Sequence, residues 1–156
     1  MSERDHAYRA RLVWDGNLGD GTAKYETYGR QHRLLFAGKP GIEATADPAF
    51  RGDPARLNPE DLLVGALASC HMLSYLALCA RSRIRVLAYE DDAHGVMRED
   101  GRGGGRFEWV ELRPRVRVSG PADVERATRL HDKAHELCFI SSSCNFPVRH
   151  RAEVRV

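Results

Sequence analysis

The sequence has almost no excess of charge of either sign. Its 24 lysines and arginines are offset by 22 aspartates and glutamates, which leaves a formal net charge of +2. The arginines are scattered among acidic residues, form no basic block and do not alternate with aromatic residues. This pattern argues against a nucleic-acid-binding surface, because such surfaces concentrate positive charge and stacking rings.

The chain also lacks the motifs of several large enzyme classes. It has no Cys-x-x-Cys pair, no Gly-x-Ser-x-Gly, and no glycine-rich loop in the strand-to-helix context that phosphates or dinucleotides require. The glycine-rich run at 101–105 is expected to form the tip of a hairpin instead. We therefore expect no metal, flavin or nucleotide cofactor.

The N-terminal residues lack the apolar core of a signal peptide, because residues 1–6 are polar and of mixed charge. We therefore expect a cytoplasmic protein, in a compartment that keeps thiols reduced. Four cysteines in such a protein are more often catalytic, metal-binding or inert than joined in structural disulfides.

What the chain contains is typical of one soluble domain. Of its 156 residues, 42% are hydrophobic and 29% charged, which predicts a single globular domain over residues 1–156. The apolar segment 62–80 is about as long as a membrane span. Because it contains Ser69, His71 and Ser74, we interpret it as a buried central helix rather than a membrane segment. A chain of this size has little material to cover such a helix, so we expect a homodimer.

The residue pattern predicts an α+β domain in which antiparallel strands surround a long buried helix. The expected strands lie at 7–14, 22–29, 31–37, 42–46, 85–97, 107–118 and 148–156. The expected helices run over 59–82 and from 121 to Cys138. Asn58 is a good N-cap for the first helix, and Pro59 suits its first position.

The four cysteines differ in their surroundings. Cys70 lies on an apolar stripe of the first helix, and Cys138 lies at the end of the second helix. Cys79 is nine positions after Cys70 and points away from it, so we interpret it as a packing residue. Cys144 lies in a serine-rich loop, where it is either an exposed bystander or an alternative partner for the other two. Each of these thiols can also be a small buried apolar group without a chemical role.

His131 and His135 have the one spacing in the sequence that could hold a metal on a helix, and Cys138 follows three residues later. This trio is the metal-binding alternative. The simpler interpretation places both histidines on a half-exposed helix face.

Two blocks of the sequence resemble the OsmC/Ohr family of peroxide-reducing proteins. The first is Asn-Pro-Glu-Asp-Leu-Leu from Asn58, followed by Ala-Leu-Ala-Ser-Cys, with Glu60 ten positions before Cys70. The second is Ala-His-Glu-Leu-Cys-Phe-Ile-Ser-Ser-Ser, which contains Cys138. With the glycine-rich hairpin between them, the resemblance covers nearly the whole chain. It implies an OsmC-like fold and an intertwined homodimer, with active sites at the subunit interface.

The resemblance also implies residue roles. Cys70 would be the peroxidatic thiol and Cys138 the resolving thiol, while Glu60 would pair with an arginine that lowers the pKa of Cys70 and orients the peroxide. The candidate arginines are Arg51, Arg56 and Arg30. We favour Arg51, because it lies in the loop before the helix, nine positions before Glu60.

The sequence departs from the family's common pattern after Cys138. Phe139 stands where that pattern has proline. The chain therefore resembles a less characterised OsmC-like branch, and whether Cys144 can replace Cys138 is left open by the residues.

The implied activity is thiol-dependent reduction of organic hydroperoxides through a Cys70 sulfenic acid and a Cys70–Cys138 disulfide. An external dithiol would reduce that disulfide; lipoyl-bearing proteins serve this purpose in related proteins. The substrate pocket is expected to be lined by Leu67, Leu73, Phe50 and Phe139. Two alternatives remain: a non-catalytic dimer that binds a small apolar ligand in the interface pocket, and a purely structural dimer whose cysteines are all core. Neither a nucleic-acid nor a membrane partner is expected.

Overall fold

The computed structural model describes residues 4–156 as a mixed α+β chain, as predicted. The chain falls into two compact units, one ending at Leu62 and one spanning Leu63–Val156. The single domain over residues 1–156 stays a prediction.

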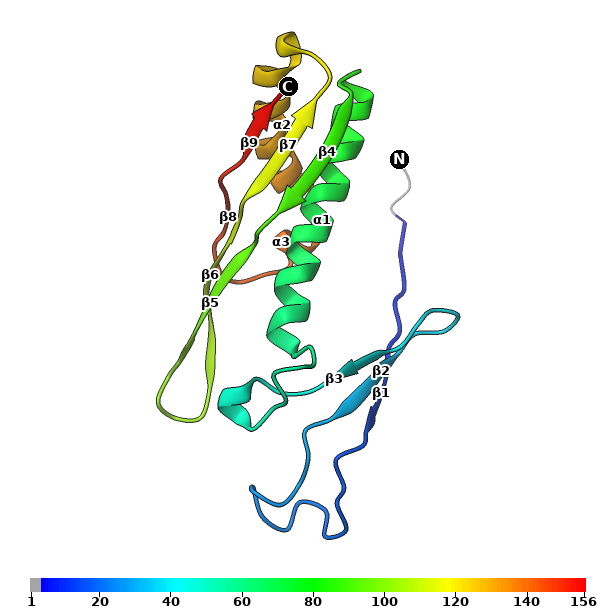
Figure 1. The fold of residues 1–156 in the computed structure, drawn as a ribbon, viewed down its shortest axis with the longest axis vertical. Helices are drawn as coiled ribbons and strands as arrows, with labels where there is room; N and C mark the ends of the chain where they lie inside the picture. Colours follow the sequence, from blue (N-terminus) through cyan, green and yellow to red (C-terminus); the bar gives the residue numbers. More distant parts are fainter. Residues whose placement is uncertain (1–3) are drawn as a thin grey trace. The chain divides into compact units, whose positions relative to one another are not determined.

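The first unit contains a three-stranded antiparallel meander of β1 (Arg11–Trp14), β2 (His32–Leu35) and β3 (Ile42–Ala44) (Figure 1). Leu34 of β2 lies opposite Leu12 of β1 on one side and Ile42 of β3 on the other. This row of apolar side chains fixes the register, because a slip by one residue would turn the row to the opposite face. A short 3₁₀ helix, η1 (Pro48–Phe50), follows.

The strand predicted at 22–29 is wrong. The segment forms a series of turns, in which the Thr27 amide donates to the Lys24 carbonyl. The Arg30 guanidinium donates to the carbonyls of Tyr25 and Tyr28. Backbone groups that a ladder would use are therefore bound locally, so the alternating residues of this segment do not pair as a strand.

Helix α1 (Pro59–Arg81) begins and ends close to the predicted bounds. At its start, the Asn58 side chain accepts from the Asp61 amide at 2.8 Å, and the Asp61 carboxylate accepts from the Asn58 amide at 3.1 Å. This reciprocal pair satisfies amides that the first helical turn leaves unpaired. Just after its end, Arg83 adopts a left-handed φ of 61°, and the Arg126 guanidinium donates to the Ser82 carbonyl at 2.9 Å.

Much of the apolar surface of α1 is not covered within one chain. By length and hydropathy, α1 qualifies as a candidate membrane span, but the core helix of a soluble protein passes the same test. Its buried residues are Leu67, His71, Tyr75 and Cys79. Only 22% of its most apolar window is buried. The exposed residues include Gly65, Ser69 and Leu73, which recur every four positions along one side of the helix.

The second unit has two three-stranded sheets that share one long bent hairpin (Figure 1). The strands are β4 (Val86–Asp91), β5 (His94–Glu99), β6 (Gly105–Leu112), β7 (Pro114–Val118), β8 (Val148–His150) and β9 (Glu153–Arg155). One sheet has the order β4-β7-β9 and the other β5-β6-β8. In each, the hairpin strands are antiparallel and the C-terminal strand is parallel to its neighbour. The predicted strands 85–97, 107–118 and 148–156 thus each divide into two.

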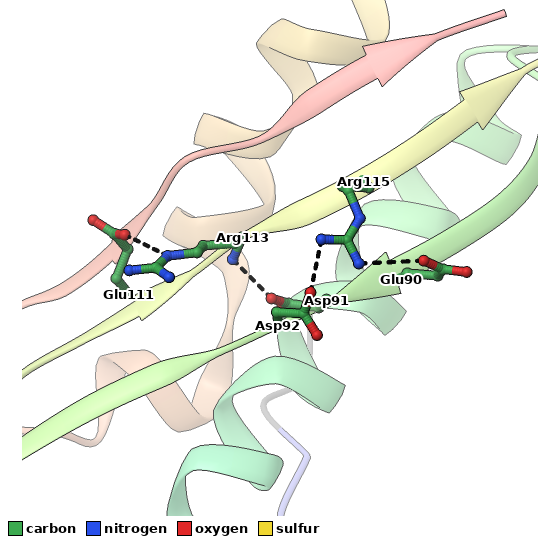
Figure 2. A network of polar contacts seen from close by, with 6 residues as sticks. All are labelled: Glu90, Asp91, Asp92, Glu111, Arg113 and Arg115. Carbon is green, nitrogen blue, oxygen red and sulfur yellow. Dashed lines mark hydrogen bonds and ion pairs between the residues drawn. The ribbon is translucent and has the colours of Figure 1, made fainter.

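A polar network marks the bend at which the hairpin passes from one sheet to the other (Figure 2). The Arg113 amide donates to Asp91 at 2.7 Å, and its guanidinium donates to Glu111 at 2.8 Å. Arg115 bridges Asp92 at 2.7 Å and Glu90 at 3.3 Å. Such exposed ion pairs contribute little to stability. The backbone bond to Asp91 is the important one, because it replaces a ladder bond at the bend.

Helix α2 (Val124–Leu137) follows a 3₁₀ turn, η2 (Pro121–Asp123), and a short helix, α3 (Phe139–Ser142), follows α2. Ala127, His131 and Ala134 form the buried stripe of α2. The core of this unit has two clusters. One contains Tyr75, Cys79, Ile84, Val116, Val118, Ala127 and Ala134, and the other Leu67, Val110 and Leu112.

Sheet β5-β6-β8 lies very close to α1 at Gly95. A side chain at this position would meet Phe107 at 2.8 Å and Val64 of α1 at 3.1 Å. Glycine is therefore required here by the close approach of the strand to the helix.

Candidate active site

Cys70 and Cys138 lie side by side in the second unit, although they come from different helices. Cys70 is half-buried on α1, and Cys138 is buried between α2 and α3 with 1% of its surface exposed. The Cys70 thiol is close enough to Cys138 to help raise the pKa of the Cys138 thiol, and both cysteines are free. The structure thus brings together the two cysteines that the sequence singled out.

Cys138 has a defined position because it ends one helix and begins the next. Its amide donates to the His135 carbonyl at 3.3 Å, and its sulfur accepts from the Ser141 amide at 3.4 Å. Burial raises the pKa of the Cys138 thiol to about 11; the Ser141 amide opposes this rise, and the Cys70 thiol adds to it. Cys138 is therefore protonated at neutral pH, because its pKa lies well above 7.

The other two cysteines lie in different surroundings. Cys79 is 1% exposed in the core cluster of Tyr75, and burial raises its pKa. The packing role predicted for Cys79 agrees with this position. Cys144 is half-buried rather than exposed, and its thiol donates to the Ile140 carbonyl at 3.3 Å. Burial raises the pKa of Cys144 as well.

Four histidine rings and one tyrosine form a continuous cluster between α1, α2 and β8. His71 and His131 share a 3.0 Å hydrogen bond, and the Tyr75 ring stacks on His131 with centroids 3.8 Å apart. His150 of β8 lies 5.6 Å from His71 and 5.9 Å from His135, between ring centroids. His131 is fully buried, so the prediction of a half-exposed face is wrong for this residue.

The buried histidine pair is held neutral. Burial, with a smaller contribution from the neighbouring histidines, lowers the pKa of His71 to about 4 and that of His131 to about 3. His71 Nδ1 and His131 Nε2 are buried without a hydrogen-bond partner among residues 4–156. Within the same residues, no three histidine, cysteine or acidic side chains are arranged to hold a metal ion. The geometry therefore does not support the metal-binding alternative of His131, His135 and Cys138.

Glu60 and Arg30 line one pocket in the first unit. The pocket has a volume of about 310 Å³, and its walls include Trp14, Tyr28 and Phe50. Glu60 Oε2 is buried, and no group among the described residues satisfies it. The Arg30 guanidinium lies over the Tyr25 and Tyr28 rings, 4.4 and 3.9 Å from their centroids. A carboxylate with one unsatisfied oxygen and a guanidinium therefore line one cavity, whose walls include aromatic side chains.

The other two candidate arginines lie elsewhere. Arg51, the arginine favoured from the sequence, is exposed at the end of η1, has a φ of 66° and does not line this pocket. Arg56 forms long ion pairs with Glu43 at 3.7 Å and Asp53 at 3.8 Å. The role predicted for Arg51 stays a prediction, whereas the geometry of the first unit groups Glu60 with Arg30.

Of the four apolar residues expected around a substrate, only Phe50 lines the pocket of Glu60. Leu67 is fully buried in the core, whereas Leu73 and Phe139 are 61% and 83% exposed. Both of the exposed residues belong to the helices that carry the two thiols. Sequence patterning places them on helices but cannot tell a pocket wall from an uncovered surface.

Sequence reasoning missed the group around Arg30 and the contacts of Ser141. Tyr25 and Tyr28 flank Arg30, and this Tyr-x-x-Tyr-x-Arg pattern was a signal for stacking of the guanidinium on two rings. No comparable signal exists for Ser141, because its backbone contact with Cys138 depends on the bend between α2 and α3.

Comparison with known proteins gives a consistent family assignment. The sequence model of the OsmC-like protein family matches residues 52–153. A curated relative, the uncharacterised protein YmaD of Bacillus subtilis, is 24% identical over 97% of this chain and 95% of its own length.

Two solved structures illustrate the range of similar folds. An OsmC-like protein of unknown function from Vibrio cholerae has 31% sequence identity and a TM-score of 0.83, covering 98% of this chain and all of its own. An organic hydroperoxide resistance protein from Elizabethkingia anophelis, with thiocyanate bound, has 17% identity and a TM-score of 0.72, covering 99% of both chains. The second similarity concerns the fold alone.

Proposed function

Because this chain belongs to the OsmC-like protein family, we propose that it is a thiol-dependent peroxidase that reduces organic hydroperoxides. The observation that carries this proposal is the proximity of the Cys70 and Cys138 side chains, which is close enough for the Cys70 thiol to help raise the pKa of Cys138. Two free cysteines far apart in sequence form a disulfide only if the fold brings their sulfur atoms together. The proximity of Cys70, on a long helix, to Cys138, at the junction of two others, supports such a disulfide here.

The proposed reaction has two steps in the protein. The Cys70 thiolate attacks the O–O bond of the hydroperoxide, and that bond breaks as an S–O bond forms. The leaving alkoxide takes a proton and departs as an alcohol, while Cys70 becomes a sulfenic acid. Cys138 then attacks the Cys70 sulfur, the S–O bond breaks, and water leaves with the formation of the disulfide.

Arg30 and Glu60 are proposed as the arginine–glutamate pair of this reaction. In the family the pair favours the thiolate and orients the peroxide, and Arg30 shares a pocket with the unsatisfied Glu60 carboxylate. A guanidinium suits this role because it stays charged and donates several hydrogen bonds. The aromatic walls of the pocket favour alkyl or aryl hydroperoxides, since each buried methylene contributes about 0.8 kcal/mol to binding.

An external dithiol is proposed as the reductant that regenerates the two thiols. Thiol–disulfide exchange requires an attacking thiolate to reach one of the two sulfur atoms. Cys70 is half-buried whereas Cys138 is buried, so Cys70 is the more accessible sulfur. Lipoyl-bearing proteins, which serve this purpose in related proteins, are the proposed class of reductant, and the cytoplasm is the proposed compartment.

Single-turnover consumption of tert-butyl hydroperoxide tests the proposed function. Reduced wild-type protein should consume one equivalent, and Cys70→Ser should consume none. Cys138→Ser should consume one equivalent and stop at a sulfenic acid that dimedone captures on Cys70. Cys144→Ser is the matched control and should behave as the wild type. Unconsumed peroxide with the wild type, or full consumption by Cys70→Ser, would refute the proposal.

A second candidate function is the binding of a small apolar ligand without catalysis. It is favoured because Arg30 and Glu60 do not bond to each other. The Arg30 guanidinium donates to the carbonyls of Tyr25 and Tyr28, and Glu60 Oε2 has no partner among the described residues. Trp14 lines the same pocket. Quenching of Trp14 fluorescence by an aliphatic alcohol, in a protein that leaves peroxide unconsumed, would support this candidate over the peroxidase.

A further inference from the structure

In the proposed reaction, the buried thiol of Cys138 must act as a nucleophile. Its thiol is buried and carries a raised pKa, so it is protonated at neutral pH. A neutral thiol is a poor nucleophile, and the attack on Cys70 requires charge to develop on the Cys138 sulfur. A donor aimed at this sulfur would stabilise that charge. The Ser141 amide is such a donor, 3.4 Å from the sulfur.

Ser141 is bound at both of its polar ends. Its amide faces the Cys138 sulfur, and its hydroxyl lies 3.5 Å from Nδ1 of His135. The His135 carbonyl in turn accepts from the Cys138 amide at 3.3 Å. Three contacts thus close a small ring of residues around the thiol. Both Ser141 and His135 are half-buried, so solvent does not fully replace these contacts.

The His135 ring also lies near a second histidine ring. His150 of β8 lies 5.9 Å away between ring centroids, and its Nε2 is 3.1 Å from the Asp132 carboxylate of α2. The groups around the Cys138 site are therefore Cys70 from α1, His135 from α2, Ser141 from α3 and, next to His135, His150 from β8. Each of the elements that meet here contributes one of these groups.

We propose that His135 is a positioning residue that holds Ser141, so that the Ser141 amide stabilises the Cys138 thiolate during disulfide formation. This inference rests on the proposed peroxidase function. The step balances without a further reactant: the Cys138 S–H and Cys70 S–O bonds break, the S–S bond forms, and the thiol proton leaves with the hydroxyl as water. His135 acts through Ser141 and touches neither sulfur in this scheme.

Three variants separate this role from general stability. His135→Phe keeps a ring but removes the contact with Ser141, Ser141→Ala removes the hydroxyl but keeps the amide, and His135→Asn restores a polar atom near the position of Nδ1. The exposed Ser142→Ala on the same helix is the control. The readout is the rate of Cys70–Cys138 disulfide formation after Cys70 has been oxidised by one equivalent of tert-butyl hydroperoxide.

The first two variants should form the disulfide about 3–10-fold more slowly than the wild type, as expected when the hydrogen bond from the Ser141 amide to the charged sulfur is weakened but not lost. Their rate of peroxide consumption should be unchanged, and His135→Asn should recover most of the disulfide rate. Wild-type disulfide rates in His135→Phe and Ser141→Ala would overturn the inference and leave the proposed function intact. No peroxide consumption by the wild type would instead overturn the proposed function.

A second readout does not depend on peroxide. In the Cys70→Ser background, the pH dependence of Cys138 alkylation by iodoacetamide reports how readily this thiol ionises. His135→Phe and Ser141→Ala should shift the alkylation profile to higher pH, and His135→Asn should shift it back. Profiles that coincide in all four proteins would contradict a role of His135 in stabilising the thiolate.

Discussion

Arg30 is held by its own loop. Its guanidinium lies over the rings of Tyr25 and Tyr28 and donates to the backbone carbonyls of the same two residues. The pocket that Arg30 lines also contains the Glu60 carboxylate, one oxygen of which is unsatisfied. Trp14 supports the same loop, because its indole donates to the Gly29 carbonyl at 2.8 Å. The local structure therefore fixes the position of this arginine, whereas Arg51 is exposed and outside the pocket.

At the residue scale, we expect Arg30→Met to slow the oxidation of Cys70 by tert-butyl hydroperoxide by about 10–100-fold, because charge-assisted hydrogen bonds contribute about 1.5–3 kcal/mol. Arg51→Met is the matched control and should keep nearly the full rate. Stopped-flow measurement of the first turnover gives both values. A large loss in Arg51→Met together with an unchanged rate in Arg30→Met would return the role to Arg51.

At the scale of elements, the contact of α1 with α2 depends on a neutral histidine pair. His71 and His131 share one hydrogen bond in the core, and burial lowers the pKa of both. In the unfolded chain both imidazoles titrate near pH 6.5. Below that pH the unfolded state binds more protons than the folded state, so the free energy of unfolding falls as pH falls.

We expect the free energy of unfolding to be highest above pH 6.5 and to decrease as the pH falls from 6.5 towards 4. The loss should amount to about 2 kcal/mol per histidine between pH 7.5 and 4.5. Urea denaturation at fixed protein concentration over this range measures it. His6→Asn, which changes an exposed histidine, should show the same pH dependence. A flat stability profile between pH 7 and 5 would contradict the neutral pair.

Local sequence signals predicted the elements but not the contacts between them. Asn58, Pro59 and the acidic first turn placed the start of α1 correctly, because helix caps act over a few residues. The strand predicted at 22–29 failed because Arg30 binds the backbone of this segment. The partners of Cys138 and His131 lie on other elements, and periodicity within one element carries no information about them.

At the scale of the whole molecule, one side of α1 remains uncovered. Gly65, Ser69 and Leu73 recur every four residues and are exposed, and a side chain added at Gly65 would meet nothing within 4 Å. Ridges at this spacing pack into the grooves of another helix. The family resemblance implies an intertwined homodimer, and we propose that a second copy of the chain covers this side of α1.

We therefore expect the protein to sediment as a dimer at micromolar concentration and Leu73→Asp to sediment as a monomer, because a charge at a closely packed apolar contact is not tolerated. Leu18→Asp places the same charge at an exposed leucine of the first unit and should leave the dimer intact. Sedimentation velocity decides the matter. A monomeric wild type would refute the dimer, and a dimeric Leu73→Asp would place the interface elsewhere.

The proposed peroxidase mechanism depends most directly on the disulfide between Cys70 and Cys138. Reduced protein is treated with one equivalent of tert-butyl hydroperoxide, and peptides are mapped under non-reducing conditions. The account predicts a rapid, stoichiometric disulfide between Cys70 and Cys138, whose side chains lie close together in the reduced protein. Peroxide left unconsumed with Cys70 still a free thiol, or a disulfide that excludes Cys70, would contradict it.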